Sequence, residues 1–261
     1  MGIFSKMRRT AAVVGIAGFA AVVSAAAFAA GDAKEPKNRD WHFEGIFGTV
    51  DRASAQRGLQ VYIEVCAGCH SLKQVAYRNL ADLGFTEAEI KVIASGFDVT
   101  DGPNDDGEMF ERPAIPSDRF VSPFPNEEAA KAANNGANPP DLTLQVKAHP
   151  GGADYIHALL TGYVDPPAGT EVPEGSNYNA YYAGNFIAMP QPLYADGVEY
   201  ADGTPATIEQ MATDVVNFMQ WAAEPEMEQR KKIGFKVVIF LIILSAILYA
   251  GKRKMWANVD H

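Results

Sequence analysis

The run Cys66-Ala67-Gly68-Cys69-His70 places two thiols and an imidazole within five consecutive residues. A Cys-x-x-Cys-His run is typical of a site where a c-type haem is attached covalently. The two thiols add across the two vinyl groups of one porphyrin, and the next residue is then held beneath the iron. We therefore expect one covalently bound haem c, with thioether bonds to Cys66 and Cys69 and with His70 as the proximal iron ligand.

The cysteine content narrows the alternatives. Cys66 and Cys69 are the only cysteines among the 261 residues, so no further thiols are left to complete a four-cysteine zinc or iron–sulfur site. A thioredoxin-like redox pair remains open, but such a pair does not require His70. It also usually follows a strand, whereas residues 53–65 have the apolar spacing of a helix.

The first thirty residues have the pattern of an export signal. Basic residues at positions 6, 8 and 9 precede the apolar run 11–28, and small residues follow at Ala29 and Ala30. This pattern predicts a secretory signal peptide over residues 1–30, cleaved near Ala29 or Ala30. A retained N-terminal anchor is the alternative, but the run is rich in Ala and Val rather than in Leu and Ile, which favours cleavage.

A second apolar run, 233–251, contains 19 residues. At ~1.5 Å per residue it would span about 28 Å, which matches the hydrocarbon core of a bilayer. We expect a transmembrane helix with basic flanks over residues 230–254. Because a signal peptide directs the export of the chain behind it, residues 31–229 should form an extracytoplasmic haem c domain and residues 255–261 a cytoplasmic tail. The predicted location is the bacterial cytoplasmic (inner) membrane, crossed once, with the haem domain on the periplasmic side.

The predicted exported part is strongly acidic. Residues 31–231 contain 14 basic and 31 acidic residues, which gives a formal charge of −17, against −10 for the whole chain. This sign opposes binding to nucleic acid, because a phosphate-binding surface must be basic. It favours a basic protein partner, although acidic side chains can also serve only to keep an exported domain soluble.

The rest of the chain predicts a mainly α fold. Asp51, Thr86 and Thr207 are candidate helix N-caps, the last two as capping boxes with Glu89 and Gln210. The stretches with helical spacing are 53–65, 72–83, 86–96, 126–136, 151–160 and 207–224. Two stretches rich in Pro and Gly, 98–125 and 163–205, should be long loop insertions. A calcium loop within 98–125 is disfavoured, since the terminal glutamate of such loops is missing.

A c-type iron either keeps its second axial position open or fills it with Met or His. The candidates in this sequence are His42, His149, His157, His261, Met109, Met189, Met211, Met219 and Met227. Met211 and Met219 lie on the apolar stripe of a predicted helix, and His261 lies beyond the membrane span. Met189 stands in the proline-stiffened loop 187–192, and we favour it as the sixth ligand; its alternative role is that of a buried, gap-filling methionine. Ligation by His70 and Met189 would leave no open position for a substrate, so the haem should carry single electrons.

Beyond the pentapeptide, the chain after residue 30 resembles the cytochrome c1 family, the haem c subunits of ubiquinol:cytochrome c reductase (complex III). The motifs that carry the resemblance are Val61-Tyr62, Ala76-Tyr77-Arg78, Asp101-Gly102-Pro103-Asn104-Asp105-Asp106-Gly107-Glu108-Met109-Phe110, Ala132-Ala133-Asn134-Asn135-Gly136-Ala137, Pro139-Pro140-Asp141-Leu142, Leu159-Leu160-Thr161-Gly162-Tyr163, Ala188-Met189-Pro190, Asp202-Gly203-Thr204-Pro205-Ala206-Thr207 and Trp221-Ala222-Ala223-Glu224-Pro225-Glu226.

The resemblance implies a cytochrome c-like haem domain with long loop insertions, followed by one C-terminal transmembrane helix. It implies transfer of single electrons from a Rieske iron–sulfur protein to a soluble, basic cytochrome c in a respiratory or photosynthetic chain. The partners would be cytochrome b and the Rieske subunit in a dimeric complex, with quinol oxidised on other subunits and no substrate chemistry at this haem. Carried over by position, it also implies that Tyr62, Asn134, Pro140 and Tyr155 line the haem pocket.

One stretch departs from the family pattern. Family members commonly have an arginine near the haem propionates, just before a Gly-Gly pair, whereas this chain has Lys147-Ala148-His149-Pro150-Gly151-Gly152. Protonated His149 or Lys147 would have to replace that arginine. Two other functions share part of the pattern: a stand-alone anchored cytochrome c, which does not need the long insertions, and a haem peroxidase, which needs an open iron.

Overall fold

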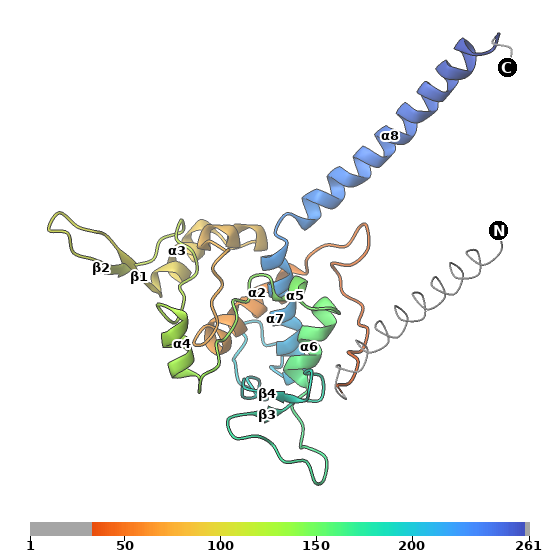
Figure 1. Cartoon of the computed structure of the whole chain (residues 1–261). Helices are drawn as coiled ribbons and strands as arrows, with labels where there is room; N and C mark the ends of the chain where they lie inside the picture. Colours follow the sequence, from red (N-terminus) through yellow and green to blue (C-terminus); the bar gives the residue numbers. More distant parts are fainter. Residues whose placement is uncertain (1–32, 259–261) are drawn as a thin grey trace, which may run out of the picture. The chain divides into compact units, whose positions relative to one another are not determined.

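The structure is a computed structural model that describes residues 33–258, so the predicted signal peptide lies outside the described residues. These residues divide into two compact units, one made of 36–161 and 191–258 and the other of 33–35 and 162–190. Within the described chain, α-helices provide most of the regular structure and the strands are short (Figure 1). The predicted mainly α fold is confirmed.

Helices α2 (Arg52–Val61) and α7 (Ile208–Ala223) are paired in the larger unit and begin at the predicted caps. The side chain of Asp51 accepts a backbone N–H of the first turn of α2, and Thr207 does the same for α7. Each cap satisfies a donor that a helix end otherwise leaves without a partner. The predictions of both helix starts are confirmed.

The core lies where α7 packs against α2. A Cβ atom on Gly58 of α2 would lie 2.0 Å from the carbonyl oxygen of Asp214 in α7, so only glycine permits this close helix crossing. The predicted apolar stripe of α7 is buried throughout: Met211, Val215, Phe218, Met219 and Ala222. Burial of this stripe supplies the hydrophobic free energy that holds the two helices together.

The prediction of one helix over 72–83 is only partly right. The helical part is η3 (Tyr77–Leu83), a short 3-10 helix, and the stretch before it is not helical. There the carbonyl oxygen of Val75 accepts the amide of Phe120 instead of a helical partner. Leu72 and Val75 are nevertheless buried, so their spacing reflects burial and not helical periodicity.

The remaining predicted helices are present in the same unit. Thr86 and Glu89 form the predicted capping box at the start of one of them. The bounds are α3 (Glu87–Ser95), α4 (Glu127–Ala133) and α6 (Gly152–Thr161). One further short helix, α5 (Gln145–Ala148), was not predicted, because a single turn has too little periodicity to stand out.

The insertion 98–125 contains no helix, as predicted, but it does contain a hairpin. Strand β1 (Asp98–Asp101) pairs in antiparallel fashion with β2 (Phe110–Pro113) (Figure 1). Most side chains of these strands are exposed, so they lack the alternation of apolar and polar residues that predicts a strand.

The smaller unit is loop-rich, as predicted for its part of 163–205. Its regular structure is the two-residue pair β3 (Asn177–Tyr178) and β4 (Phe186–Ile187). Buried Asn185 donates its side-chain amide to the carbonyl oxygens of Asn179 and Ala180, which fixes the turn that joins the strands. Side-chain bonds of this kind replace the backbone ladder of a larger sheet.

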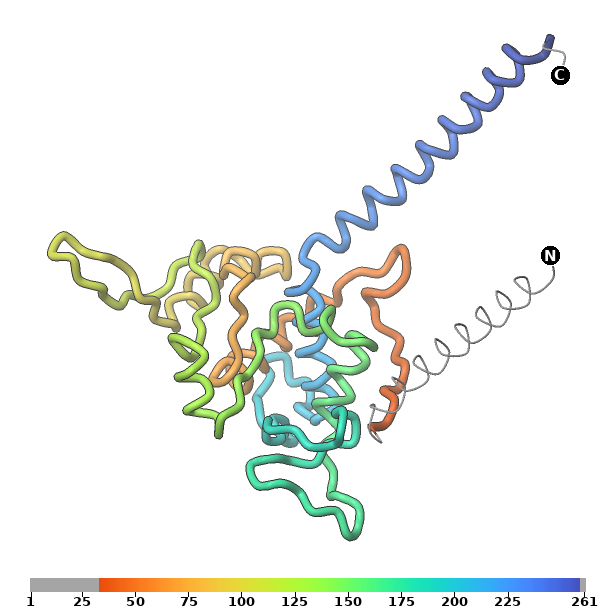
Figure 2. Tube along the Cα trace, in the orientation of Figure 1, coloured from red at the N-terminus to blue at the C-terminus, as the bar shows by residue number. Residues whose placement is uncertain are grey.

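The last helix of the described residues is α8 (Met227–Met255), which extends away from the rest of the larger unit (Figures 1 and 2). Within the described residues it is the one helix long and apolar enough to cross a bilayer, and the side chains of its apolar part are exposed. It begins before the predicted apolar run and shortly after Pro225, which separates it from α7. The helix fits the predicted transmembrane anchor.

Candidate functional site

The Cys-x-x-Cys-His run lies where α2 ends. The helix continues into a single π-helical turn, η2 (Tyr62–Cys66), and the amide of Ala67 donates to the carbonyl oxygen of Tyr62 at 2.8 Å. The carbonyl oxygen of Cys66 then accepts the amides of Cys69, at 3.1 Å, and His70, at 2.9 Å. These bonds hold the two thiols and the imidazole on one compact turn, as the pentapeptide predicts.

The imidazole of His70 is fixed by the backbone of Pro140. Nδ1 lies 2.8 Å from the carbonyl oxygen of Pro140, which can only accept, so Nδ1 carries the proton and donates. The second ring nitrogen, Nε2, is then the one that can bind a metal. Burial lowers the pKa of His70, which favours the neutral imidazole that metals bind. A ligand histidine whose other nitrogen donates to a backbone carbonyl is the usual arrangement in metal proteins.

Tyr62 holds the same turn from the core side. Its hydroxyl donates to the carbonyl oxygen of His70 at 3.2 Å, and its ring packs against Phe120 and Phe218. The side chain is buried, and desolvation raises its pKa, so the phenol remains a donor at physiological pH. The structure therefore brings together Tyr62, His70 and Pro140, three of the predicted site residues.

Asp141, next to Pro140, was not predicted to take part. Its carboxylate accepts the Ser71 hydroxyl at 2.9 Å, the Lys73 amide at 2.7 Å and the Thr143 amide at 3.0 Å. Burial alone would raise its pKa, but these hydrogen bonds outweigh burial and lower the pKa below its usual range. The carboxylate thus ties 139–143 to the residues that come after His70. An Asp with Thr two residues on, after two prolines, is a turn signal that could have identified it.

The chemistry of the donor set fits a covalently bound haem better than the alternatives. Cys66 and Cys69 form no disulfide, so both sulfur atoms are available for thioether bonds. Residues 33–258 contain no cluster of three or more His, Cys, Asp or Glu side chains that could hold a metal ion. Two thiols and one oriented imidazole are what porphyrin attachment requires.

Met189 belongs to the smaller unit, so its pairing with His70 stays a prediction. Its own loop is held firmly. The carbonyl oxygen of Met189 accepts the hydroxyl of Tyr163 at 3.0 Å and the side-chain amide of Asn177 at 3.3 Å. Neither partner was predicted. These two hydrogen bonds fix the backbone of Met189, as is expected of a residue whose side chain must be held in place to bind a metal.

The other two predicted pocket residues have local contacts. Asn134 ends α4 and donates its side-chain amide to the carbonyl oxygen of Ala130 at 2.7 Å. The ring of Tyr155, on α6, lies against that of His149 with centroids 4.8 Å apart. Their place in a haem pocket stays a prediction.

Lys147 and His149, the two residues that could replace the family's arginine near the haem propionates, each contact another side chain of this protein. Lys147 forms an ion pair with Glu224 at 2.7 Å, and His149 Nε2 lies 3.1 Å from the side-chain oxygen of Gln145. Of the two, His149 has the weaker competing bond, because its partner is neutral. Its role towards the propionates stays a prediction.

A helical domain that carries a Cys-x-x-Cys-His turn with an oriented imidazole defines the class of c-type cytochromes. The model of the Cytochrome C1 family matches residues 41–259. The chain belongs to this family, whose members are haem subunits of complex III in electron transport.

Three relatives illustrate the similarity. A Rhodospirillum rubrum protein named cytochrome c1 is 48% identical over 239 residues, which is 85% of this chain and 88% of that protein. A mitochondrial cytochrome c1-2 of Solanum tuberosum is 51% identical over 249 residues, 95% of this chain and 94% of that one. A Bradyrhizobium diazoefficiens protein named cytochrome b/c1 is 48% identical over 250 residues, 87% of this chain, but these cover only 36% of that longer protein.

Proposed function

We propose that this chain is a membrane-anchored c-type cytochrome that passes single electrons from a Rieske iron–sulfur protein to a soluble cytochrome c. It would do so as the electron-transfer subunit of a quinol:cytochrome c reductase in a respiratory or photosynthetic chain. The observation that carries this proposal is the His70 imidazole, whose Nδ1 is held by Pro140 and whose Nε2 is left for iron, in a chain of the Cytochrome C1 family.

The proposed site consists of Cys66 and Cys69 as thioether donors and of His70 and Met189 as axial ligands. A haem bound there supplies an iron that alternates between its ferric and ferrous states and so carries one electron. His70 stays neutral and oriented through Pro140, and Tyr62 restrains its backbone. Met189, on a loop held by two side chains, would occupy the other axial position and exclude a substrate or oxygen.

The proposed topology rests on the two apolar segments. Residues 1–30 would be a signal peptide that is removed, and 31–229 an extracytoplasmic haem domain. Residues 230–254 would cross the inner membrane once and leave 255–261 in the cytoplasm. Helix α8, exposed along its apolar length, supports the anchor.

The proposed partners are cytochrome b and the Rieske protein in a dimeric complex, and a basic cytochrome c as the acceptor. The name cytochrome b/c1 of the Bradyrhizobium relative supports the first of these, since it mentions cytochrome b and cytochrome c1 together. The formal charge of −17 over residues 31–231 supports the basic acceptor, because opposite charges speed the encounter of electron-transfer proteins.

The test is purification of the chain through a C-terminal tag from its own membranes in mild detergent. We expect a c-type haem that stays on the chain after denaturation, together with b-type haem, an iron–sulfur protein and quinol-dependent reduction of cytochrome c. A covalent haem without these companions would instead support a stand-alone anchored shuttle. Rapid binding of cyanide or carbon monoxide would contradict the closed axial position.

A further inference from the structure

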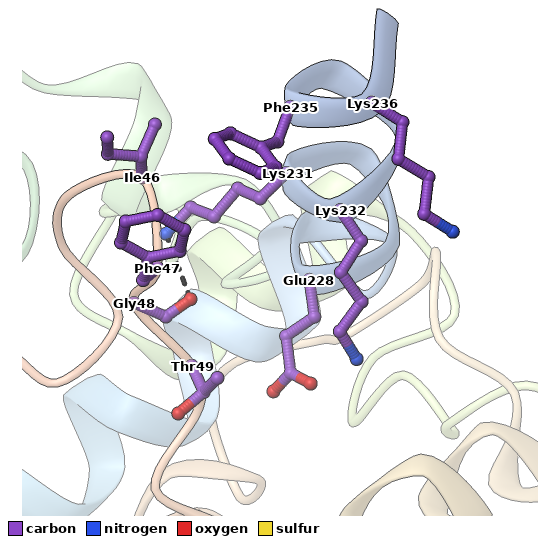
Figure 3. Close-up of a pocket in the computed structure, with 9 residues that line it drawn as sticks. All are labelled: Ile46, Phe47, Gly48, Thr49, Glu228, Lys231, Lys232, Phe235 and Lys236. Atoms are coloured by element: carbon purple, nitrogen blue, oxygen red, sulfur yellow. Dashed lines mark hydrogen bonds between the residues drawn. The ribbon is translucent and has the colours of Figure 1, made fainter. Parts of the chain in front are cut away.

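The loop before α2 forms a pocket with the first turns of α8 (Figure 3). The pocket has a volume of about 230 Å³, and its lining belongs entirely to the larger unit: Ile46, Phe47, Gly48, Thr49, Glu228, Lys231, Lys232, Phe235 and Lys236. None of these residues takes part in the proposed electron-transfer site.

Three interactions hold the loop against the helix. The ammonium group of Lys231 donates to the carbonyl oxygens of Phe43 and Gly48. The carboxylate of Glu228 accepts the Val50 amide at 3.0 Å, and it also forms an ion pair with Arg52 of α2. A Cβ atom on Gly48 would lie 1.9 Å from a backbone carbonyl oxygen, so the loop requires glycine there. The pocket is therefore a fixed feature of the fold.

The apolar wall of the pocket is exposed where a soluble domain would bury it. Phe47 is 73% exposed and Ile46 is 68% exposed, and the ring of Phe47 packs edge-on against Phe235 with centroids 5.6 Å apart. Phe235 lies in the first turn of the apolar run 233–251. The loop tip therefore lies at the level where α8 enters the hydrocarbon layer.

Two cations complete the pocket. Lys232 and Lys236 are one helical turn apart, and Figure 3 shows them along one flank of α8, with Phe47 and Phe235 along the other. Neither lysine forms a salt bridge with any residue in 33–258, although Lys232 lies near enough to Glu228 to help lower the pKa of that carboxyl group. Glu228 already has an arginine partner, so both ammonium groups are left to face an external anion.

We propose that this pocket binds an anionic phospholipid of the extracytoplasmic leaflet. The phosphate would lie between Lys232 and Lys236, and an acyl chain would lie along Phe47 and Phe235. The two lysines and the apolar wall line the same pocket, at the end of α8 where the apolar run begins, so this pocket offers partners to both the headgroup and the acyl chain of such a lipid. This proposal rests on the membrane anchoring proposed above but not on the haem or on electron transfer.

The experiment measures lipid binding by the full-length, haem-containing protein after detergent has removed its native lipids. Phosphatidylglycerol, phosphatidylcholine and inorganic phosphate are titrated separately, and bound lipid is counted by native mass spectrometry. The variant is Lys232→Gln with Lys236→Gln. Its matched control is Lys73→Gln with Lys91→Gln, which removes the same charge from exposed positions away from α8.

We expect the pocket variant to bind phosphatidylglycerol at least about tenfold more weakly than the wild type, because each lysine near a headgroup contributes substantially. The control should bind like the wild type, and phosphatidylcholine should bind more weakly than phosphatidylglycerol. Equal affinity of variant and wild type would overturn the proposal. Displacement of the lipid by an equal concentration of inorganic phosphate would also overturn it, since that would indicate a site for free anions only.

A second pair of variants tests the apolar wall. Phe47→Ser should weaken phosphatidylglycerol binding, whereas Val92→Ser, at a similarly exposed position on α3, should not. Loss of a partner subunit from the Phe47→Ser protein, with lipid binding unchanged, would show that Phe47 contacts a protein and would overturn the lipid site.

A wash of the membranes with alkaline carbonate distinguishes failure of the proposed membrane anchoring from failure of the proposed lipid site. A wild-type chain that is released from the membrane by this wash contradicts both the anchoring and the lipid site. A chain that stays in the membrane, but binds phosphatidylglycerol equally well with and without the two lysines, contradicts the lipid site alone.

Discussion

His70 is held by one backbone group and by one side chain. Pro140 fixes Nδ1 through its carbonyl oxygen, and Tyr62 holds the carbonyl of His70 itself. Because residue 140 is proline, its φ is restricted, which limits how the backbone beside this carbonyl can move. These two hydrogen bonds restrict the imidazole and so fix the direction of Nε2.

Met189→Leu tests the proposed sixth ligand. Leucine keeps the apolar volume but cannot bind iron, so the haem should stay covalently attached while its Met charge-transfer absorption disappears. The reduction potential should fall by roughly 100 mV or more, because Met ligation favours ferrous iron and axial ligands set potentials over a wide range. Met109→Leu, at an exposed position, is the control and should leave both properties unchanged. An intact charge-transfer band in Met189→Leu would show that another residue is the ligand.

Asp141→Asn tests the carboxylate that ties 139–143 to the residues after His70. The amide cannot accept all three hydrogen bonds, so the free energy of unfolding at pH 7 should fall by about 1–3 kcal/mol. The folded-state pKa of Asp141 is lowered, so its contribution is present above the unfolded value of about 3.9 and is lost as the pH falls through the lower, folded value.

The difference in free energy of unfolding between Asp141→Asn and the wild type should therefore be largest at neutral pH and decrease in acid below about pH 4. Urea unfolding across this range measures it. Asp105→Asn, at an exposed position of the hairpin, is the control and should change stability little at any pH. A difference that persists undiminished in strong acid would mean that the carboxylate charge is not what stabilises this turn.

At the scale of elements, the helix pair α2 and α7 positions the haem turn, because the Cys-x-x-Cys-His run continues directly from the end of α2. The pair is locked by a buried network as well as by apolar contact. Asp214 of α7 is fully buried, accepts the Ser54 hydroxyl at 2.7 Å and forms an ion pair with Arg57 at 2.9 Å. Removing one partner from such a pair would leave a buried group unsatisfied, so the network restricts how the two helices can slide.

Gly58→Ala tests the helix crossing. The added methyl group would meet the backbone of α7, which cannot move aside as a side chain could. We expect the free energy of unfolding to fall by about 1–3 kcal/mol or more, as for overpacked cores. Gly96→Ala, where the new methyl group would make only an ordinary contact, is the control. Unfolding in urea compares the two, and equal stability would mean that the helices separate more easily than this packing suggests.

The elements that sequence predicts well are those whose signal is local. Asp51, Thr86 and Thr207 mark helix starts because a cap acts within its own first turn. The helix predicted over 72–83 is wrong for its first residues, because the carbonyl oxygen of Val75 accepts the amide of Phe120, far along the chain, instead of a helical partner. In the site, the pentapeptide predicts His70 as the iron ligand. Neither the Pro140 bond nor the role of Asp141 could be derived from spacing, since both join residues about 70 positions apart.

At the scale of the whole molecule, charge is distributed unevenly along the chain. Residues 31–231 carry a formal charge of −17, while basic residues flank the membrane helix at both ends. The acidic part suits a basic electron acceptor that must arrive and leave quickly, and weak, charge-steered encounters are typical of electron-transfer partners.

The acceptor reaction should therefore depend strongly on salt. With a basic cytochrome c, we expect the second-order rate constant for oxidation of the reduced protein to fall at least about tenfold between low salt and several hundred millimolar. Stopped-flow mixing measures this rate, and a small uncharged oxidant serves as the control whose rate should change little. A rate with cytochrome c that is independent of salt would exclude charge steering.

The measurement that comes first is single-turnover electron transfer in the tagged complex, followed at the c-type haem after rapid mixing with a quinol. We expect the haem to be reduced only when the iron–sulfur protein is present, and then to be reoxidised by added ferric cytochrome c. A haem that quinol cannot reduce in the intact complex, or that reduces at the same rate without the iron–sulfur protein, would contradict the proposed place of this chain between the Rieske protein and cytochrome c.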